Sequence, residues 1–145
     1  MVHALSEIRR VLVPNGILID LRPVLSHWPI EVISARAARE TGHIQDLPLG
    51  LADDKAANRA IAQAEQKGWF GREAEEFFSF QYVWDSPSEM EEWINDEWQD
   101  FIQLDDGSKQ ATRSAWALGD ADSAVRVGVN MLITRWKKER TGDDE

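Results

Sequence analysis

The feature of this sequence that most constrains its fold is a Pro-Asn-Gly turn at residues 14–16, placed between a helical pattern and an apolar run. Residues 2–13 predict a helix, because apolar side chains recur there at helical spacing. These side chains are Leu5, Ile8, Val11 and Leu12. The proline disfavours helical backbone before it and Asn-Gly tolerates positive φ, so the helix ends there. Residues 17–19 and Leu21 then predict a short strand buried on both faces, which completes one step of an α/β fold.

The middle of the chain has two interpretations. Residues 30–36 and 41–47 form two strands that turn near Gly42, or one helix runs through residues 35–39. The β-branched residues of the first segment and the interruption by glycine favour the hairpin. The next segment, residues 53–67, predicts a helix because it is rich in Ala, Gln and Lys, and Gly68 is placed to end it.

Two alternating patterns predict strands in the second half of the chain, over residues 76–84 and 124–136. In the first strand, aromatic side chains occupy one face: Phe78, Phe80, Tyr82 and Trp84. In the last strand, the apolar face consists of Val125, Val127, Val129, Met131 and Ile133.

Two helices are predicted between these strands. The first begins at Ser86, because Pro87 suits the first helical position and Glu89 completes a capping box. Its apolar stripe consists of Met90, Trp93, Ile94, Trp98, Phe101 and Ile102. The second helix is predicted over residues 108–118.

The composition limits the function classes. The 145 residues suit one domain, over residues 1–137, followed by a flexible acidic tail over residues 138–145. There are 16 Lys and Arg against 26 Asp and Glu, and the net charge of −10 argues against nucleic-acid binding. The absence of cysteine excludes disulfides and Cys-ligated zinc and fits a cytoplasmic protein. No secretory signal is present, and no apolar run approaches the roughly 18 residues of a membrane span.

One segment carries a resemblance to a known family. Residues 4–20 read Ala-Leu-Ser-Glu-Ile-Arg-Arg-Val-Leu-Val-Pro-Asn-Gly-Ile-Leu-Ile-Asp. This closely resembles the third motif of class I S-adenosylmethionine-dependent methyltransferases, a helix that leads into the fifth strand of their sheet. Val13 stands where Lys is usual, and Asn15 replaces the first Gly. The resemblance implies a partial Rossmann-like sheet: a three-stranded mixed core with helices and a β-hairpin insertion, its last strand antiparallel between the other two.

The same resemblance implies that the cofactor site is missing. The family holds S-adenosylmethionine with a glycine-rich turn and an acidic residue upstream of this motif, where only three residues stand here. No Gly-x-Gly-x-x-Gly loop occurs in the chain. We therefore expect the C-terminal half of a methyltransferase, a truncated product or a split-enzyme subunit, with no cofactor bound by this chain alone and no methyl transfer on its own.

A missing fourth strand would leave an open edge. The edge from Ile17 to Asp20 is apolar, and exposed edges of this kind recruit other chains. We therefore expect a homo-oligomer or a partner chain at this edge. The alternative function is a non-enzymatic binding module, in which an aromatic apolar groove between residues 76–84 and the helix after them holds an apolar ligand or a partner helix.

Four residues near the end of the first strand are the substrate-side candidates: Asp20, Arg22, His27 and Trp28. Ligands of open α/β sheets bind beyond the carboxyl ends of the strands. Arg22 would anchor an anionic group and His27 would accept a proton. The competing interpretation makes Asp20 and Arg22 surface residues and packs Trp28 on the sheet.

Other motifs indicate no catalytic centre. His3, His27 and His43 lack the spacing of metal ligands. The sequence contains no paired acid–base spacing and no Gly-x-Ser-x-Gly elbow. It therefore does not favour a stand-alone hydrolase or isomerase.

Acidic residues are concentrated in one part of the chain. Twelve of them, and no Lys or Arg, lie between Glu73 and Ser108. This run is either a negative face for a cationic substrate or basic partner, or the solvated outer face of a helix. The pairs at residues 53–54 and 105–106 are expected to begin helices, where carboxylates favour the positive end of the helix dipole.

Overall fold

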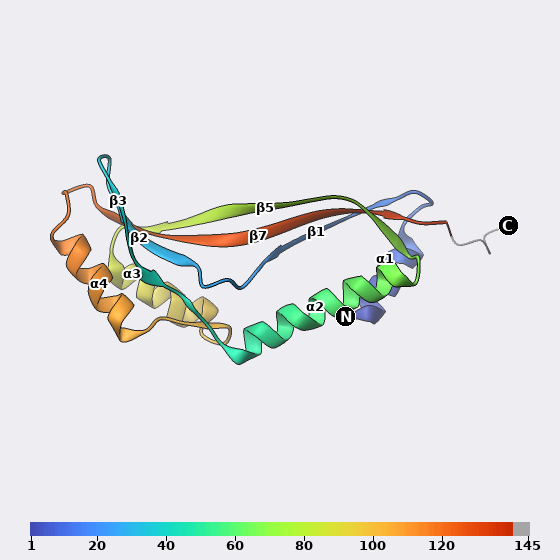
Figure 1. The fold of residues 1–145 in the computed structure, drawn as a ribbon, viewed down its shortest axis with the longest axis horizontal. Helices are drawn as coiled ribbons and strands as arrows, with labels where there is room; N and C mark the ends of the chain where they lie inside the picture. Colours follow the sequence, from blue (N-terminus) through green and yellow to red (C-terminus); the bar gives the residue numbers. More distant parts are fainter. Residues whose placement is uncertain (141–145) are drawn as a thin grey trace. The chain divides into compact units, whose positions relative to one another are not determined.

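The computed structural model describes residues 1–140, which form four α-helices, one π-helical segment and seven strands (Figure 1). This mixture of helices and a largely antiparallel sheet confirms the predicted α/β class. The elements are α1 (Val2–Val11), β1 (Ile17–Pro23), β2 (Pro29–Ile33), β3 (Ala38–His43), β4 (Gln45–Asp46), α2 (Pro48–Gln66), β5 (Phe70–Trp84), α3 (Pro87–Trp93), the π-helical segment (Ile94–Trp98), β6 (Ile102–Gln103), α4 (Asp106–Ala117) and β7 (Ala124–Lys138).

The contacts within the chain divide it into two compact units, where the sequence predicts a single domain over residues 1–137. Unit 1 contains Met1–Pro23, Ala52–Phe78 and the described residues from Met131 onward. Unit 2 contains Val24–Leu51 and Ser79–Asn130. Helix α2 and strands β5 and β7 therefore contribute residues to both units.

The sheet of unit 1 has three strands in the order β1-β7-β5. Strand β1 pairs antiparallel with residues 131–137 of β7. Strand β5 pairs with the other edge of β7, and the contacts Glu73–Arg135 and Glu75–Thr134 show that it also runs antiparallel. With β2 and β3 the sheet has five strands, where the sequence predicts a three-stranded core, and the neighbouring strands are antiparallel.

Helix α1 and the part of α2 in unit 1 lie on the same side of β1 and β7 (Figure 1). The buried cluster between them and the strands is formed by Ala64, Phe70 and Trp136. The half-buried side chains that pack on this cluster are Leu5, Ile8, Leu12, Leu18, Ile61 and Trp69. The predicted apolar face of α1 is therefore confirmed except at Val11, which is 65% exposed.

Strand β1 is covered on one face only. The predicted turn before it is present, with Asn15 at a φ of 61°. Along the strand, half-buried and exposed residues alternate, and Ile17, Ile19 and Leu21 are the exposed apolar ones. The expectation of burial on both faces is wrong, because the covering helices of this unit pack on the side of Leu18.

The burial pattern of β7 changes phase along the strand. Its first half is buried at Val125, Val127 and Val129, as predicted. Its second half is buried at Leu132, Thr134 and Trp136, whereas residues 131 and 133 of the predicted apolar face are only half-buried. The sequence does not reveal this change, because apolar side chains occur at both odd and even positions of the strand.

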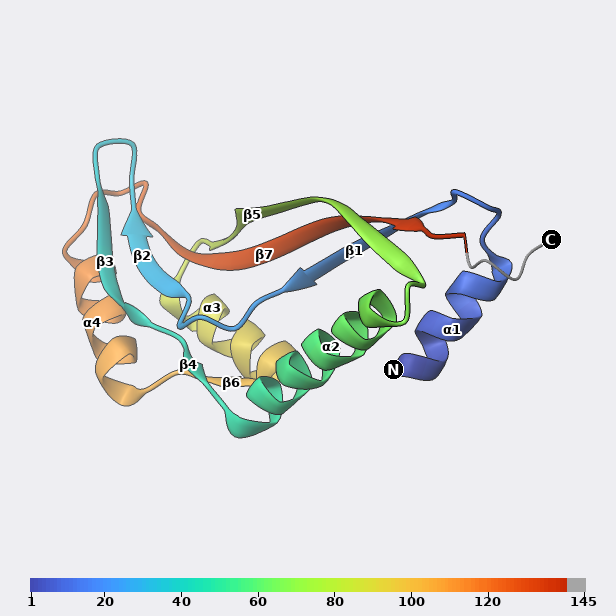
Figure 2. The same ribbon diagram turned by 45° about the vertical axis from the view of Figure 1, so that its right-hand side comes forward.

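Unit 2 contains the predicted hairpin, formed by β2 and β3 with α4 beside it (Figure 2). The turn lies at residues 34–37, where the N–H of Ser34 donates to the carbonyl oxygen of Ala37 at 2.8 Å. Gly42 is not at the turn, which corrects the prediction. It lies within β3 opposite Ile30, and a Cβ there would overlap the side chain of Ser108 on α4. The glycine therefore permits close packing of the helix on the hairpin.

Two helices of unit 2 begin at side-chain caps. For α3, the hydroxyl of Ser86 accepts the N–H of Glu89, and the Glu89 carboxylate accepts the N–H of Asp85, which confirms the predicted capping. For α4, the carboxylate of Asp105 accepts the N–H of Ser108 at 3.1 Å. Hydrogen bonds from the side chain and backbone of Ser108 lower the pKa of Asp105. The predicted helix start at residues 105–106 is confirmed.

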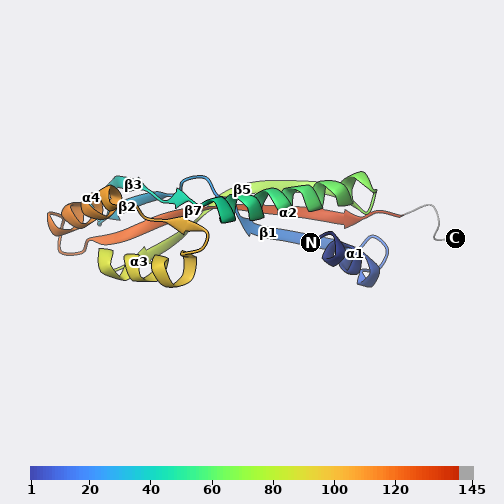
Figure 3. The ribbon, with the colours of Figure 1, turned by 90° about the horizontal axis from the view of Figure 1, so that it is seen from below.

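Helix α3 is shorter than the sequence predicts. It ends at Trp93 and continues as a π-helical segment to Trp98 (Figure 3). The predicted apolar stripe is only partly buried, since Trp93 is 40% exposed and Phe101 is 41% exposed. Ile102 is buried, but it lies in β6 and not in the helix.

Two elements begin earlier than predicted. Helix α2 begins at Pro48, so the acidic pair at residues 53–54 lies inside the helix and the expected helix start there is wrong. Gly68 ends the helix region at a φ of 67°, as predicted. Strand β5 begins at Phe70, six residues before the predicted start at residue 76.

The predicted flexible tail over residues 138–145 is ordered at its start. Lys138 is the last residue of β7, and the N–H of Glu139 donates to the carbonyl oxygen of Trp69 at 3.1 Å. Residues 141–145 lie outside the described residues. Within the described part of the chain, no helix is long and apolar enough to cross a membrane, and the cytoplasmic location stays a prediction.

Candidate functional site

The four predicted substrate-side residues fall into two pairs. Asp20 and Arg22 lie on β1 in unit 1. His27 and Trp28 lie in unit 2, in the loop directly before β2. The two pairs have different neighbours, so they differ in which polar atoms already have a partner within the chain.

In unit 1, Arg22 is held by two neighbours. Its Nε lies 3.4 Å from a carboxylate oxygen of Asp20, and its Nη2 donates to the side-chain oxygen of Asn58 on α2 at 2.8 Å. The side chains of Arg22 and Asp20 are only 20% and 26% exposed. Since Asp20 balances the charge of Arg22, this pair supports the structural interpretation rather than an anchor for an anionic ligand.

Trp28 is a core residue of unit 2. It is 5% exposed, and its Nε1 donates to the carbonyl oxygen of Val24 at 2.8 Å. Its ring meets that of Trp98 edge to face, with ring centroids 5.5 Å apart. Because its polar atom and its ring are both occupied within the unit, Trp28 has a packing role.

His27 is held beside a buried carboxylate. Its backbone is left-handed, with a φ of 51°, and its N–H donates to Oδ2 of Asp46 at 3.4 Å. Its Nε2 lies 3.8 Å from the same oxygen. The imidazole is 67% exposed, whereas the Asp46 side chain is only 5% exposed. The second carboxylate oxygen of Asp46, Oδ1, is buried and has no hydrogen-bond partner among the described residues.

These two residues line a pocket of about 580 Å³ that lies entirely within unit 2. The loop before β2, the end of β3, strand β4 and the start of α4 form its walls. Its lining consists of His27, Gly42, His43, Gln45, Asp46, Asp105 and Ser108. We call it the Asp46 pocket.

The electrostatics of the Asp46 pocket favour cations. It is lined by two carboxylates and two imidazoles, and by no Lys or Arg. Ser108 favours the ionised form of Asp105 by lowering its pKa, and Nε2 of His43 lies 2.8 Å from a carboxylate oxygen of Glu40. The pocket therefore presents hydrogen-bond acceptors and negative charge.

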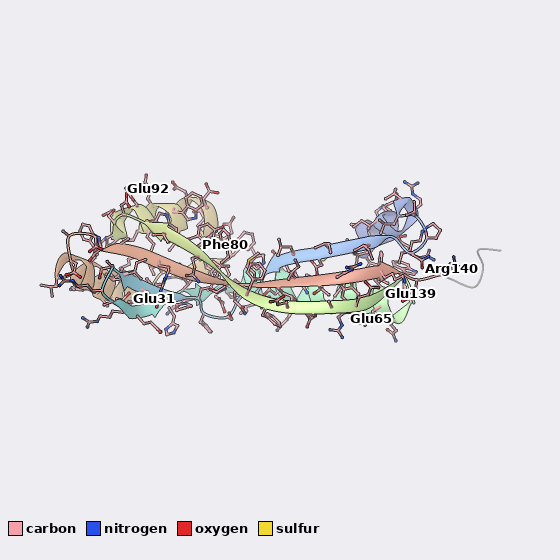
Figure 4. The ribbon with its side chains drawn as sticks, turned by 90° about the horizontal axis from the view of Figure 1, so that it is seen from above. Glu31, Glu65, Phe80, Glu92, Glu139 and Arg140 are labelled. Atoms are coloured by element: carbon pink, nitrogen blue, oxygen red, sulfur yellow. The ribbon has the colours of Figure 1, made fainter. Side chains whose placement is uncertain are left out.

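A second pocket lies on the aromatic side of unit 2. The rings of Tyr82, Trp84, Trp93 and Trp98 form a cluster with centroid separations between 5.0 and 6.4 Å. A pocket of about 320 Å³ is lined by Trp84 and Trp93 together with Glu89, Glu92, Asp96 and Glu97. Figure 4 labels Glu92 on α3 and Phe80 on β5. The expected aromatic groove is therefore accompanied by four carboxylates and is not purely apolar.

The acidic run from Glu73 onward is partly neutralised. Glu73 pairs with Arg135 at 2.9 Å in unit 1. In unit 2, Glu91 pairs with Arg113, and this pairing raises the pKa of the arginine. In the part of the chain that the structure describes, no group of three or more His, Asp or Glu is arranged to hold a metal ion.

Sequence reasoning found His27 but missed its partner. Asp46 lies nineteen residues away along the chain, and no periodic spacing connects the two. Their contact depends on the hairpin, which returns the chain from β3 past His27 into β4. The signal available in the sequence was a lone aspartate beside a predicted strand end, which is too common to nominate a site.

Comparison of the chain with models of protein families, with curated proteins and with solved structures returned no match. Function is therefore argued from the geometry of the two units.

Proposed function

We propose that this chain forms the C-terminal part of an S-adenosylmethionine-dependent methyltransferase fold and transfers no methyl group on its own. The observation that carries this proposal is the strand order β1-β7-β5 in unit 1, in which the last strand lies antiparallel between the other two. It follows a helix, turn and strand whose residues 4–20 resemble the third motif of that family.

The chain order supports this proposal. Because β1 and β5 are both antiparallel to β7, they are parallel to each other, and α2 connects them as a crossover helix. This is the arrangement expected for the end of a Rossmann-like sheet. The β2–β3 hairpin and the helices of unit 2 are then an insertion between its strands.

The proposed lack of activity follows from the cofactor. Binding S-adenosylmethionine in this family needs a glycine-rich strand-to-helix turn, and the sequence contains none. The glycines near β5 do not replace it, since Gly68 ends a helix and Gly71 lies in the strand itself.

The proposal is tested by calorimetric titration of the folded chain with S-adenosylmethionine and S-adenosylhomocysteine. We expect no heat of binding at micromolar concentrations, with circular dichroism showing an intact fold in the same sample. Micromolar binding by the chain alone would overturn the proposal that it lacks a cofactor site.

The open edge of β1 supports a proposal about partners. Hydrogen bonds from Lys138 to Gly16 and from Val24 to Asn130 show that even-numbered residues of β1 direct their backbone groups toward β7. The N–H and C=O groups of Ile17, Ile19 and Leu21 consequently face the other edge, where no described strand pairs. The side chains of these three residues are also exposed, by 36%, 53% and 55%.

We propose that a second copy of the chain pairs with this edge when no other strand does. An antiparallel pair centred on Ile19 places Ile17 opposite Leu21 of the second copy and Leu18 opposite Asp20. All exposed side chains on one face are then aliphatic, and no like charges stand opposite each other. The segment is thus self-complementary.

Sedimentation across micromolar concentrations tests this pairing. We expect the wild-type chain to self-associate and Ile19→Lys to remain a monomer, because the charge would lie within the paired strands. Val13→Lys is the matched control, since Val13 is 69% exposed but lies outside β1. A wild-type chain that stays monomeric throughout would contradict the proposed pairing.

A binding module is the second candidate function. It is favoured by Phe80 and Trp93, which are 50% and 40% exposed while both rings contact Tyr82. Exposed aromatic residues in mutual contact are typical of ligand or partner sites. A neutral apolar dye such as Nile red should bind this surface and fluoresce. Its fluorescence should be weaker with the Phe80→Ser variant than with wild type. Equal fluorescence with the two proteins would contradict the binding module.

A further inference from the structure

An exposed aromatic surface on unit 2 is the strongest sign of a partner site. Phe80 on β5 and Trp93 at the end of α3 are both exposed. Trp93 is nevertheless held by its neighbours, since its ring centroid lies 6.0 Å from that of Tyr82 and 6.4 Å from that of Trp84. Phe80 contacts Tyr82 in turn, with centroids 5.2 Å apart. Exposed apolar side chains that gather in one place usually mark an interaction site.

Carboxylates surround the exposed ring of Trp93. The pocket of about 320 Å³ beside this ring is lined by Trp84, Glu89, Glu92, Trp93, Asp96 and Glu97, and among the described residues no Lys or Arg lines it. We call these six residues the Trp93 face. Within the described part of the chain, the side chains of Glu92, Asp96 and Glu97 form no ion pair or hydrogen bond, whereas the neighbouring Glu91 pairs with Arg113. The negative charge of this face is therefore not neutralised by the fold.

The chemistry of the Trp93 face favours a guanidinium group. Carboxylates without a partner attract a cation, and a tryptophan ring binds a cation through its face. A guanidinium uses both features at once, because it is planar and stacks on an aromatic ring while its N–H groups donate to carboxylates. An ammonium group stacks less well, and an anion is repelled by the four carboxylates.

Two observations indicate which kind of molecule carries this group. The aromatic surface extends from the Trp93 face through Tyr82 to Phe80, so it suits a segment of a chain better than a single small cation. The net charge of the protein is −10, so a second copy would bring like charge to an already acidic surface. A basic segment of another protein is complementary in charge.

We propose that the Trp93 face binds an arginine-bearing segment of a partner protein. The guanidinium stacks on Trp93 and donates to the carboxylates of Glu92 and Asp96, and an apolar side chain of the same segment lies on Phe80. This inference rests on the second candidate function, the binding module, and names its partner. It is independent of the methyltransferase proposal, because all of these residues lie in unit 2.

The test compares two peptides that have the same shape but differ in charge. Acetyl-Leu-Gly-Arg-Gly-Arg-amide and the same peptide with citrulline in place of each arginine are titrated into the isotope-labelled full chain by NMR. About 0.15 M salt screens the net negative charge. We expect the arginine peptide to shift the indole N–H signal of Trp93 to saturation and to bind at least about tenfold more tightly than the citrulline peptide. Equal affinities would overturn the proposal, because the face would then recognise no charge.

Two double variants with the same change in charge locate the site. Glu92→Gln with Asp96→Asn should weaken binding of the arginine peptide by about tenfold or more, and should leave the fold intact because both side chains are exposed. Asp53→Asn with Glu65→Gln, at exposed positions of α2 in unit 1, should bind within about twofold of wild type. Unchanged binding by the first double variant would overturn the proposal. Equal weakening in both would also overturn it, since the general acidity of the chain would then attract the peptide.

Two further measurements separate the proposal from its alternatives. If Nile red binds the surface but the arginine peptide binds no better than the citrulline peptide, the arginine proposal fails and the binding module stands. If neither the dye nor the arginine peptide binds, both fail. The chain without peptide is also measured over a range of concentrations in the Ile19→Lys variant, whose β1 edge is blocked. Concentration-dependent shifts of the Trp93 signal there would assign the face to a second copy and overturn the proposal.

Discussion

The carboxylates of Asp20 on β1 and Asp46 on β4 differ in their partners. In unit 1, Asp20 balances the charge of Arg22 and Asn58 accepts a hydrogen bond from Nη2, while Nε is buried without a hydrogen-bond partner among the described residues. In unit 2, Asp46 is more deeply buried, but its nearest basic group is the exposed imidazole of His27 at 3.8 Å. The first carboxylate has a cationic partner within the fold, whereas the second has a buried oxygen, Oδ1, without a hydrogen-bond partner among the described residues. The burial of a carboxylate is therefore informative only when the partners of both its oxygens are known.

The apolar core of unit 1 should give the largest effect, because a fully buried aromatic side chain loses the most contacts when it is truncated. Phe70 is 1% exposed and packs with Ala64 and Trp136. Phe70→Ala should lower the free energy of unfolding by about 3–5 kcal/mol, from lost burial and the cavity left behind. Urea unfolding followed by circular dichroism measures this change.

Phe77→Ala is the matched control for this substitution, since Phe77 lies on the same strand but is 56% exposed. We expect a cost below about 1 kcal/mol. Similar costs for the two variants would contradict the core of unit 1 as described.

The packing that forms the Asp46 pocket should give the next effect. A Cβ at Gly42 would overlap Ser108, so Gly42→Ala should cost about 1–3 kcal/mol through displacement of α4. In a double-mutant cycle, Ser108→Gly should recover part of this loss. Gln110→Ala, at an exposed position of the same helix, is the control and should be neutral or slightly stabilising. Additive costs at residues 42 and 108 would contradict the contact.

Asp105 links the pocket to helix α4 and should show a smaller, pH-dependent effect. Asp105→Ala should cost about 1 kcal/mol near neutral pH, because the N–H of Ser108 loses its cap. Asp105→Asn keeps an acceptor but removes the charge. Since the folded-state pKa of Asp105 is lowered, its charge stabilises the fold above the unfolded-state pKa, and this stabilisation is lost as the pH falls through the folded-state pKa.

Urea unfolding of wild type and Asp105→Asn over the acidic range checks this sign. The difference in unfolding free energy should be constant above about pH 5 and shrink at lower pH. A difference that grows on acidification would show that the charge of Asp105 opposes folding.

The sequence predicts local features that depend on neighbouring residues. The turn at Asn15, the cap at Ser86 and the end of α2 at Gly68 are all confirmed, because each rests on the conformational preference of one or two residues. The extent of burial was predicted less well. Ile19 and Leu21 are apolar in sequence but exposed in the structure, since what covers a strand depends on distant segments.

The candidate site shows the same limit. His27 was nominated from its place after a strand, whereas Asp46 became visible only when the hairpin brought it to the backbone N–H of His27. The turn of that hairpin was predicted near Gly42, but the need for glycine there comes from Ser108, which is 66 residues further on. Pairs of this kind are properties of the tertiary structure, so spacing in the sequence does not reveal them.

Substitution in the Asp20–Arg22 pair of unit 1 should have the smallest effect on the free energy of unfolding. Arg22→Met keeps much of the aliphatic stem but removes the guanidinium from Asp20 and Asn58. Because both charged side chains are partly exposed, we expect a loss below about 1 kcal/mol in the free energy of unfolding. A loss above about 3 kcal/mol would show that Asp20 without its partner behaves as a buried, uncompensated charge, and would contradict the partly exposed pair described here.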